Sequence, residues 1–367
     1  MRTLLHHFLP LQPASRYGLM VLPMLLVACA TQQSVPPSQA PLPAPSESAQ
    51  VLTAPPTGTA SMEALKTLVQ MQDRLDRIAA PLLLKNADLC KTQARNLLGF
   101  TAKNRYSYSS EFTDAASNLF GLQERLQVIG VLGGSGAALV GIKPGDVLLK
   151  AEDKDLPQGQ NAERIAATIL APMVSRKASV KMSVLRNGEA LQLNVPLTRA
   201  CGFRVELGNA DNVASYADGA RIMITRGMLG FSKSDEEVAF LIAKEMAHNA
   251  LSHPAKNRSY SAMAAMIDNL IQVKPDLSLL ITGGGIKAYP LEMDAASDHL
   301  ALYMLARAGY SIENTRLFWQ RLADQYPQSV LSSHTALHPN TSARITAMAK
   351  AASEIRSKQA AKKVLLP

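Results

Sequence analysis

Residues 234–253 read SDEEVAFLIAKEMAHNALSH and predict a single helix with a charged start. The opening serine, followed three residues later by glutamate, forms a capping box, and the acidic first turn suits the helix dipole. Apolar side chains recur at helical spacing along one face: Val238, Leu241, Ile242, Met246 and Leu251. Lys244, Glu245 and His248 remain as a polar group about one turn apart, which makes this helix the candidate site.

The composition places this helix in a folded protein. The chain has 367 residues, a formal charge of +9, 47% hydrophobic residues and 5% aromatic residues. This is too apolar for a disordered chain and long enough for two or three domains. The basic residues form no stripe with interleaved aromatics, so we expect no nucleic-acid partner.

The N-terminal segment predicts a secreted protein. Arg2 and Arg16 precede an apolar run over residues 18–28, which is too short to span a bilayer and has the length of a signal-peptide core. The run ends in Leu26-Val-Ala-Cys29, which resembles a bacterial lipobox. The resemblance implies removal of residues 1–28, lipidation of Cys29 and, because alanine follows the cysteine, an outer-membrane lipoprotein facing the periplasm. The alternative is a plain secretory signal with an incidental cysteine.

Residues 29–61 predict a tether behind that cysteine. Seven prolines and a single charge, Glu47, fall between Thr31 and Ala60. Such a segment cannot bury enough apolar surface to offset the entropy lost on ordering, so we expect a semi-extended linker. We expect membrane attachment through the lipid alone.

Cys90 and Cys201 are the remaining cysteines. An oxidising compartment permits a disulfide between them, but sequence does not give their separation. A disulfide and two separate buried thiols therefore both remain open.

The folded part has two regions that differ in their sequence pattern. Residues 62–97 carry apolar side chains at helical spacing, whereas residues 121–199 alternate short strands with glycines. Asn187-Gly188 predicts a tight hairpin turn between two strands spanning 180–195. The segment Gly141-Ile-Lys-Pro-Gly-Asp146 and the strands around it resemble a PDZ domain of the bacterial protease type, which we place at 116–199. The resemblance implies binding of an extended peptide as an added strand. The alternative is a structural module without a ligand.

The helix at 234–253 resembles the active-site helix of the M48 zinc metallopeptidases, whose motif is His-Glu-x-x-His. Other family elements match in order: an edge strand at 212–219 with 222–225, Asp294-Ala-Ala-Ser-Asp298, Leu305–Tyr310, and His338-Pro339 with Arg344. The resemblance implies an α+β fold with a zincin-like peptidase domain at 200–357 and an inserted PDZ-like domain. Residues 62–115 would be the N-terminal helical part of the scaffold, and 358–367 a tail.

Two positions depart from the family pattern. Lys244 stands in the place of the first zinc-binding histidine, and Asp294 in the place of the glutamate that is the third ligand. Asp is a competent zinc ligand, but protonated Lys offers three donors and no lone pair. Neutralising it at pH 7 costs about 4–5 kcal/mol at ~1.36 kcal/mol per pKa unit.

Two functions follow from the resemblance. In the first, the chain is a metalloendopeptidase of envelope quality control. Zinc is held by His248, Asp294 and His338, Glu245 is the general base, and Arg344 or His338 steadies the oxyanion. Substrate then adds along the strand containing Ile222, Ile224 and Thr225.

In the second, the ammonium of Lys244 occupies the metal position and pairs with Asp294, Glu245 or Asp298. The chain is then a pseudoprotease that binds peptides without cutting. Both functions imply unfolded or misassembled envelope proteins as partners.

Overall fold

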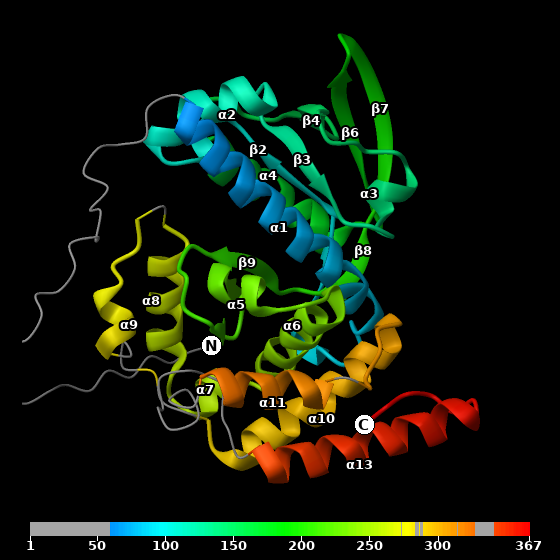
Figure 1. Cartoon of the computed structure of the whole chain (residues 1–367). Coiled ribbons are helices and arrows are strands. Elements are labelled where there is room, and N and C mark those ends of the chain that lie inside the picture. Colours follow the sequence, from blue (N-terminus) through cyan, green and yellow to red (C-terminus); the bar gives the residue numbers. More distant parts are fainter. Residues whose placement is uncertain (1–58, 273, 283–285, 287–288, 314, 327–340) are drawn as a thin grey trace, which may run out of the picture. The chain divides into compact units, whose positions relative to one another are not determined.

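The computed structural model describes residues 59–272, 274–282, 286, 289–313, 315–326 and 341–367 (Figure 1). Helices and strands both contribute to it, so the predicted α+β class is confirmed. Within the described residues, no helix is both long and apolar enough to cross a bilayer.

The PDZ-like block is built on a six-stranded sheet. Its main path runs β2-β3-β4-β6-β7, and β5 pairs with β4. The elements of this part are α2 (Thr113–Phe120), α3 (Gly136–Leu139), α4 (Ala162–Arg176), β2 (Phe100–Lys103), β3 (Gln127–Val131), β4 (Val147–Ala151), β5 (Lys154–Asp155), β6 (Ser179–Arg186) and β7 (Glu189–Pro196). Because β2 belongs to this sheet, the block begins before residue 116, where the sequence had placed its start.

The predicted hairpin is present. Strands β6 and β7 pair antiparallel, with Arg186 opposite Glu189. Asn187 and Gly188 have φ values of 50° and 84°, which is the conformation of a type I′ turn. This turn matches the right-handed twist of the two strands and fixes their register.

The first helix is shorter than predicted. Helix α1 spans Thr59–Lys85, whereas the sequence predicted a helix to residue 97. The buried Asn86 donates through Nδ2 to the carbonyl oxygens of Leu82 and Met304, which holds the chain at the helix end. Beyond it, β1 (Ala94–Leu97) pairs antiparallel with β8 (Thr198–Cys201), so this two-stranded ribbon forms the root of the inserted block.

A second sheet positions the candidate site. Its order is β10-β11-β9, with β10 at Ser215–Ala217, β11 at Arg221–Thr225 and β9 at Arg204–Gly208. The predicted substrate strand with Ile222, Ile224 and Thr225 is therefore wrong, because β11 is the central strand and both of its edges are already paired.

The outer edge of β9 is also occupied. The amide of Gln72 on α1 donates to the carbonyl oxygen of Val205 and accepts from the N–H of Leu207. A side chain thus takes the place of a neighbouring strand. Among the described residues, no strand pairs with the outer side of β10, whose three residues are buried.

The main core surrounds the candidate helix. Helices α6 (Asp235–Ala250) and α10 (Leu291–Ala308) pack together, and α1, α11 (Thr315–Gln325) and α13 (Thr341–Ala360) supply further apolar side chains (Figure 1). The shorter helices are α5 (Arg226–Phe231), α7 (His253–Lys256), α8 (Tyr260–Leu270) and α9 (Ser278–Thr282).

Candidate functional site

Helix α6 begins as the sequence predicted. Ser234 is its N-cap, and its hydroxyl accepts from the backbone N–H of Glu237 at 3.3 Å. The Glu237 carboxylate reaches back to the N–H of Lys233 at 2.7 Å and forms a two-point ion pair with Arg321. Every residue from Val238 to Asn249 is buried, so the helix is enclosed on all sides and its polar groups must be satisfied inside the protein.

The ammonium of Lys244 lies within a cluster of potential metal ligands. Its Nζ is 3.1 Å from Nε2 of His248, 3.5 Å from Oε1 of Glu245 and 3.7 Å from Oδ1 of Asp294. The side chain is fully buried, and the Trp319 ring lies 6.0 Å away. The position where relatives present an imidazole lone pair here presents N–H donors.

The other nitrogen of His248 meets a residue that the sequence did not single out. Nδ1 of His248 lies 3.0 Å from Nδ1 of His253, which is 4% exposed. Burial lowers the pKa of His253 to about 4, so this imidazole is neutral at pH 7. Both contacts are satisfied when His248 carries its proton on Nδ1: Nε2 then accepts from Lys244, and Nδ1 donates to His253.

Two further groups enclose the imidazole of His248. The Tyr289 ring stacks on it at a centroid distance of 4.1 Å, and Oγ of Ser297 lies 2.8 Å from Nε2. Ser297 stands inside the Asp294–Asp298 motif, three residues from the predicted ligand. Neither contact follows from sequence spacing, because the two residues come from segments remote from α6.

Arg344 completes the charge cluster from α13. Its guanidinium hydrogen-bonds both oxygens of Asp298, lies 3.7 Å from Asp294 and stacks 4.1 Å from the Trp319 ring. Burial raises the pKa of Asp298, with Arg344 acting in the opposite direction. The resemblance gave Arg344 a role at the oxyanion; in the structure its guanidinium pairs with Asp298 and lies beside Asp294.

Glu245 and its neighbour Asn249 connect α6 to the second sheet. Oγ of Ser215 on β10 donates to Oε1 of Glu245 at 2.8 Å. Asn249 accepts from the N–H of Gly219 and donates to the carbonyl oxygen of Arg221. The turn between β10 and β11 is therefore fixed to the same helix that carries Lys244.

The described residues do not fit a three-ligand zinc site. His248 and Asp294 are the two retained donors, and Nε2 of His248 already accepts from a protonated amine. Within the described ranges, no group of three or more His, Cys, Asp or Glu side chains is arranged to hold a metal ion. His338, the predicted additional ligand, lies outside the described residues, as does Cys29.

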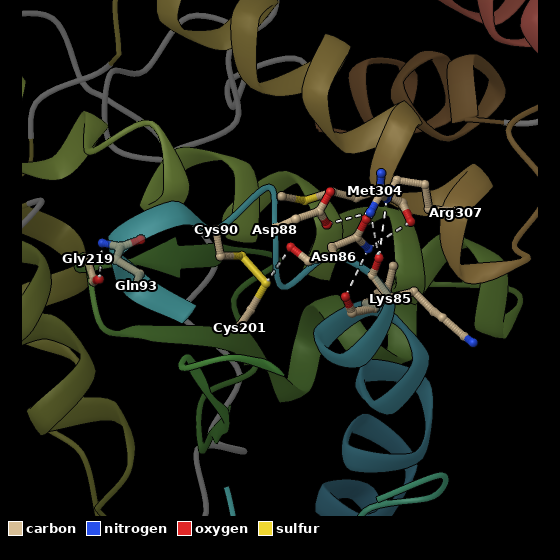
Figure 2. The surroundings of a disulfide bond; sticks show 10 residues. Lys85, Asn86, Asp88, Cys90, Gln93, Cys201, Gly219, Met304 and Arg307 are labelled. Carbon is tan, nitrogen blue, oxygen red and sulfur yellow. Dashed lines mark hydrogen bonds and ion pairs between the residues drawn. A yellow bond between two sulfur atoms is a disulfide. The ribbon is translucent and has the colours of Figure 1, made fainter. Parts of the chain in front are cut away.

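Cys90 and Cys201 form a disulfide, so of the two arrangements left open by the sequence the structure has the bonded one (Figure 2). Their Cα atoms are 5.5 Å apart. Cys201 is the last residue of β8, and Cys90 comes shortly before β1. The disulfide therefore closes the root of the inserted block, next to Asn86 and the end of α1.

These features are those of a metallopeptidase-type scaffold. Residues 176–352 match the model of peptidase family M48. The chain is thus an M48 metallopeptidase-like protein, which confirms the resemblance seen in the sequence.

Three curated relatives match this chain over part of their length. The mitochondrial metalloendopeptidase OMA1 of Schizosaccharomyces pombe is 22% identical over 35% of this chain and 40% of its own length. OMA1 of Saccharomyces cerevisiae is 23% identical over 36% of this chain and 41% of its own length. OMA1 of Arabidopsis thaliana is 25% identical over 36% of this chain and 27% of its own length. The chain therefore spans well under half of each relative.

Solved structures match part of this chain. The HtrA3 PDZ domain bound to a phage-derived ligand is 15% identical, with 29% of this chain and 88% of that chain covered and a TM-score of 0.22. The HtrA-type protease AlgW with a decapeptide is 26% identical over 29% of this chain and 30% of that chain, also at 0.22. Scores this low carry no weight for the overall fold.

Proposed function

We propose that this chain is a peptide-binding pseudopeptidase: an M48-type scaffold that holds unfolded polypeptides without hydrolysing them. The ammonium of Lys244 within 3.1 Å of Nε2 of His248 carries the proposal. A zinc ion bound to His248 needs that lone pair, and the amine already uses it.

Charge compensation supports the same conclusion. Lys244 and Arg344 supply two buried positive charges among Glu245, Asp294 and Asp298. Buried carboxylates without a nearby cation are strongly destabilising. The lysine thus supplies part of the positive charge that a divalent ion contributes in active relatives, and it keeps the scaffold folded without metal.

Strand β10 supplies the binding edge. Tyr216 lies opposite Met223 on β11, and the N–H of Asp218 donates to the carbonyl oxygen of Arg221. The backbone N–H and C=O groups of Tyr216 and Asp218 therefore face β11. Ser215 and Ala217 accordingly turn their peptide groups away from β11. A polypeptide that adds there lies next to Glu245, because the Ser215 side chain contacts that carboxylate.

Hydrolysis, the function expected first from the sequence, is the second candidate. The family match and the name metalloendopeptidase borne by all three relatives favour it. It needs Lys244 to leave His248 and a further ligand to come from outside the described residues, with His338 the candidate.

The sequence of residues 1–61 supports a location on the periplasmic side of the outer membrane, with lipid on Cys29. Incorporation of radiolabelled palmitate that is lost in Cys29→Ser, together with outer-membrane fractionation, tests this part. A labelled Cys29→Ser protein would contradict it.

Zinc content and casein cleavage test the central proposal. Full-length protein purified and dialysed at pH 7.5 should contain far less than one zinc per chain, leave casein intact and yet retain labelled, unfolded casein. Stoichiometric zinc that disappears in His248→Ala, with cleavage that disappears in Glu245→Gln, would establish hydrolysis instead.

A further inference from the structure

We infer that a cavity beside the start of β10 accepts a neutral, apolar side chain of the bound polypeptide. This inference rests on the proposed function, since it concerns a strand added to β10. The cavity has a volume of about 330 Å³. Its walls include Ala210, Asn212, Arg226, Pro275, Leu277 and Leu280. This volume is at the lower end of the ~300–1,000 Å³ that is typical of ligand pockets.

The cavity lies on the opposite face of the sheet from Glu245. The Ser215 side chain points to Glu245 on α6, and the next residue, Tyr216, packs on the other face against Met263 and Met266 of α8. Two cavity residues share that second face: Ala210 belongs to the same apolar cluster, and Nδ2 of Asn212 donates to the Tyr216 hydroxyl. Successive side chains of a strand alternate between faces.

The chain beside the cavity bends before β10 begins. Residues 210 and 212 lie in bends, and Asn212 is placed on the second face by its hydrogen bond to the Tyr216 hydroxyl. A polypeptide paired with β10 that places one side chain over Glu245 places the next side chain on the opposite face, which is the face of the cavity.

The lining favours a neutral occupant. The charges at the cavity are paired with each other: Nε of Arg226 lies 2.9 Å from Oδ1 of Asp211, and its Nη1 donates to Asn209 at 2.7 Å. The opposite wall is apolar. Leu277 on that wall is 53% exposed, so covering it with a leucine or phenylalanine side chain removes apolar surface from water.

Peptide binding to the full-length protein tests the inference. The probes are fluorescein-labelled undecapeptides of alternating Ser and Thr with one variable central residue: Ala, Leu, Phe, Lys or Glu. We expect Leu and Phe to bind about tenfold more tightly than Ala, Lys or Glu, measured by fluorescence polarisation. Leu277→Asp should abolish this preference, so that the ratio of the Leu-peptide affinity to the Ala-peptide affinity falls from about ten to about one. Ile281→Asp is the matched control, because Ile281 is 82% exposed on α9, which begins directly after Leu277, and does not line the cavity.

The outcomes separate the two proposals. Peptides that bind with equal affinity whatever the central residue would overturn the side-chain pocket and leave the peptide-binding function standing. The same loss of preference in Ile281→Asp would assign it to general apolar surface and also overturn the pocket. If no peptide binds the wild-type protein, the peptide-binding function fails and the pocket fails with it.

Discussion

Nζ of Lys244 lies 3.1 Å from Nε2 of His248, one turn further along α6. Relatives with the His-Glu-x-x-His motif have two imidazoles at these positions, and both present lone pairs to one ion. Here one partner donates to the other. A contact between the two side chains thus takes the place that one shared ion has in those relatives.

Lys244→His should create zinc affinity. The substitution removes the competing ammonium and adds a second imidazole one turn from His248. We expect about one zinc per chain after dialysis, measured by atomic absorption, against far less for the wild type. Lys256→His, at an exposed position on α7, is the control and should gain none. No gain in Lys244→His would mean that His248 and Asp294 do not converge on a metal position.

Lys244→Met should destabilise the fold by about 3–5 kcal/mol, because it leaves buried carboxylates with less positive charge. Urea denaturation followed by circular dichroism measures the change. Adding Glu245→Gln should recover part of the loss, since it removes one of the uncompensated charges. For comparison, Lys66→Met breaks only an exposed pair with Glu63 and should cost about 0–1 kcal/mol. Equal effects of the two single substitutions would contradict the compensating role of Lys244.

His253→Ala should weaken zinc binding when introduced together with Lys244→His. His253 contacts Nδ1 of His248 at 3.0 Å and so orients the ligand ring. Loss of such an outer contact costs roughly 10–100-fold in metal affinity. Isothermal titration with zinc measures it, and His299→Ala, on the half-exposed side of α10, is the control. An unchanged affinity in the His253 variant would show that Tyr289 and Ser297 suffice to orient His248.

Removing the disulfide should lower stability without changing the fold. The bond spans 111 residues of sequence, and a loop of this size is worth roughly 2–5 kcal/mol. Cys90→Ala with Cys201→Ala should therefore shift the urea midpoint downward, and dithiothreitol should shift the wild type by a similar amount. The double variant itself should not respond to dithiothreitol. If dithiothreitol shifted the urea midpoint of the double variant, the reductant would be acting on another part of the chain.

The PDZ-like block should lose stability in acid through Asp146. Burial acts to raise the pKa of this carboxyl, but the two-point contact with Arg186 and the N–H of Lys143 hold it below its ordinary value of 3.8. The folded state then binds fewer protons than the unfolded state. The stabilisation is present above pH 3.8 and is lost as the pH falls through the lower folded-state pKa.

Thermal unfolding between pH 7 and pH 2.5 measures this effect. Arg186→Gln should already be less stable at pH 7 and should fall less steeply below pH 4, because the carboxyl then titrates nearer its ordinary range. Parallel curves for the two proteins would assign the acid sensitivity to other groups.

Local sequence signals determined much of what the structure shows. The N-cap Ser234 marked the start of α6, Asn187-Gly188 marked the β6–β7 hairpin, and the family motif grouped Lys244, His248 and Asp294. Each depends on neighbours within a turn, or on a pattern that a whole family shares.

The resemblance placed an edge strand at 212–219 with 222–225, and tertiary structure decided which of the two segments is the edge. Nothing local to Ile222 shows that β9 and β10 flank β11 on both sides, or that a glutamine from α1 occupies the far edge. The sequence also did not predict the partners of His248, because Tyr289 and Ser297 come from segments remote from α6. Residue types and spacings along one helix determine which groups share its face. The groups that meet that face, and whether an amine or an ion sits among them, depend on how distant segments pack.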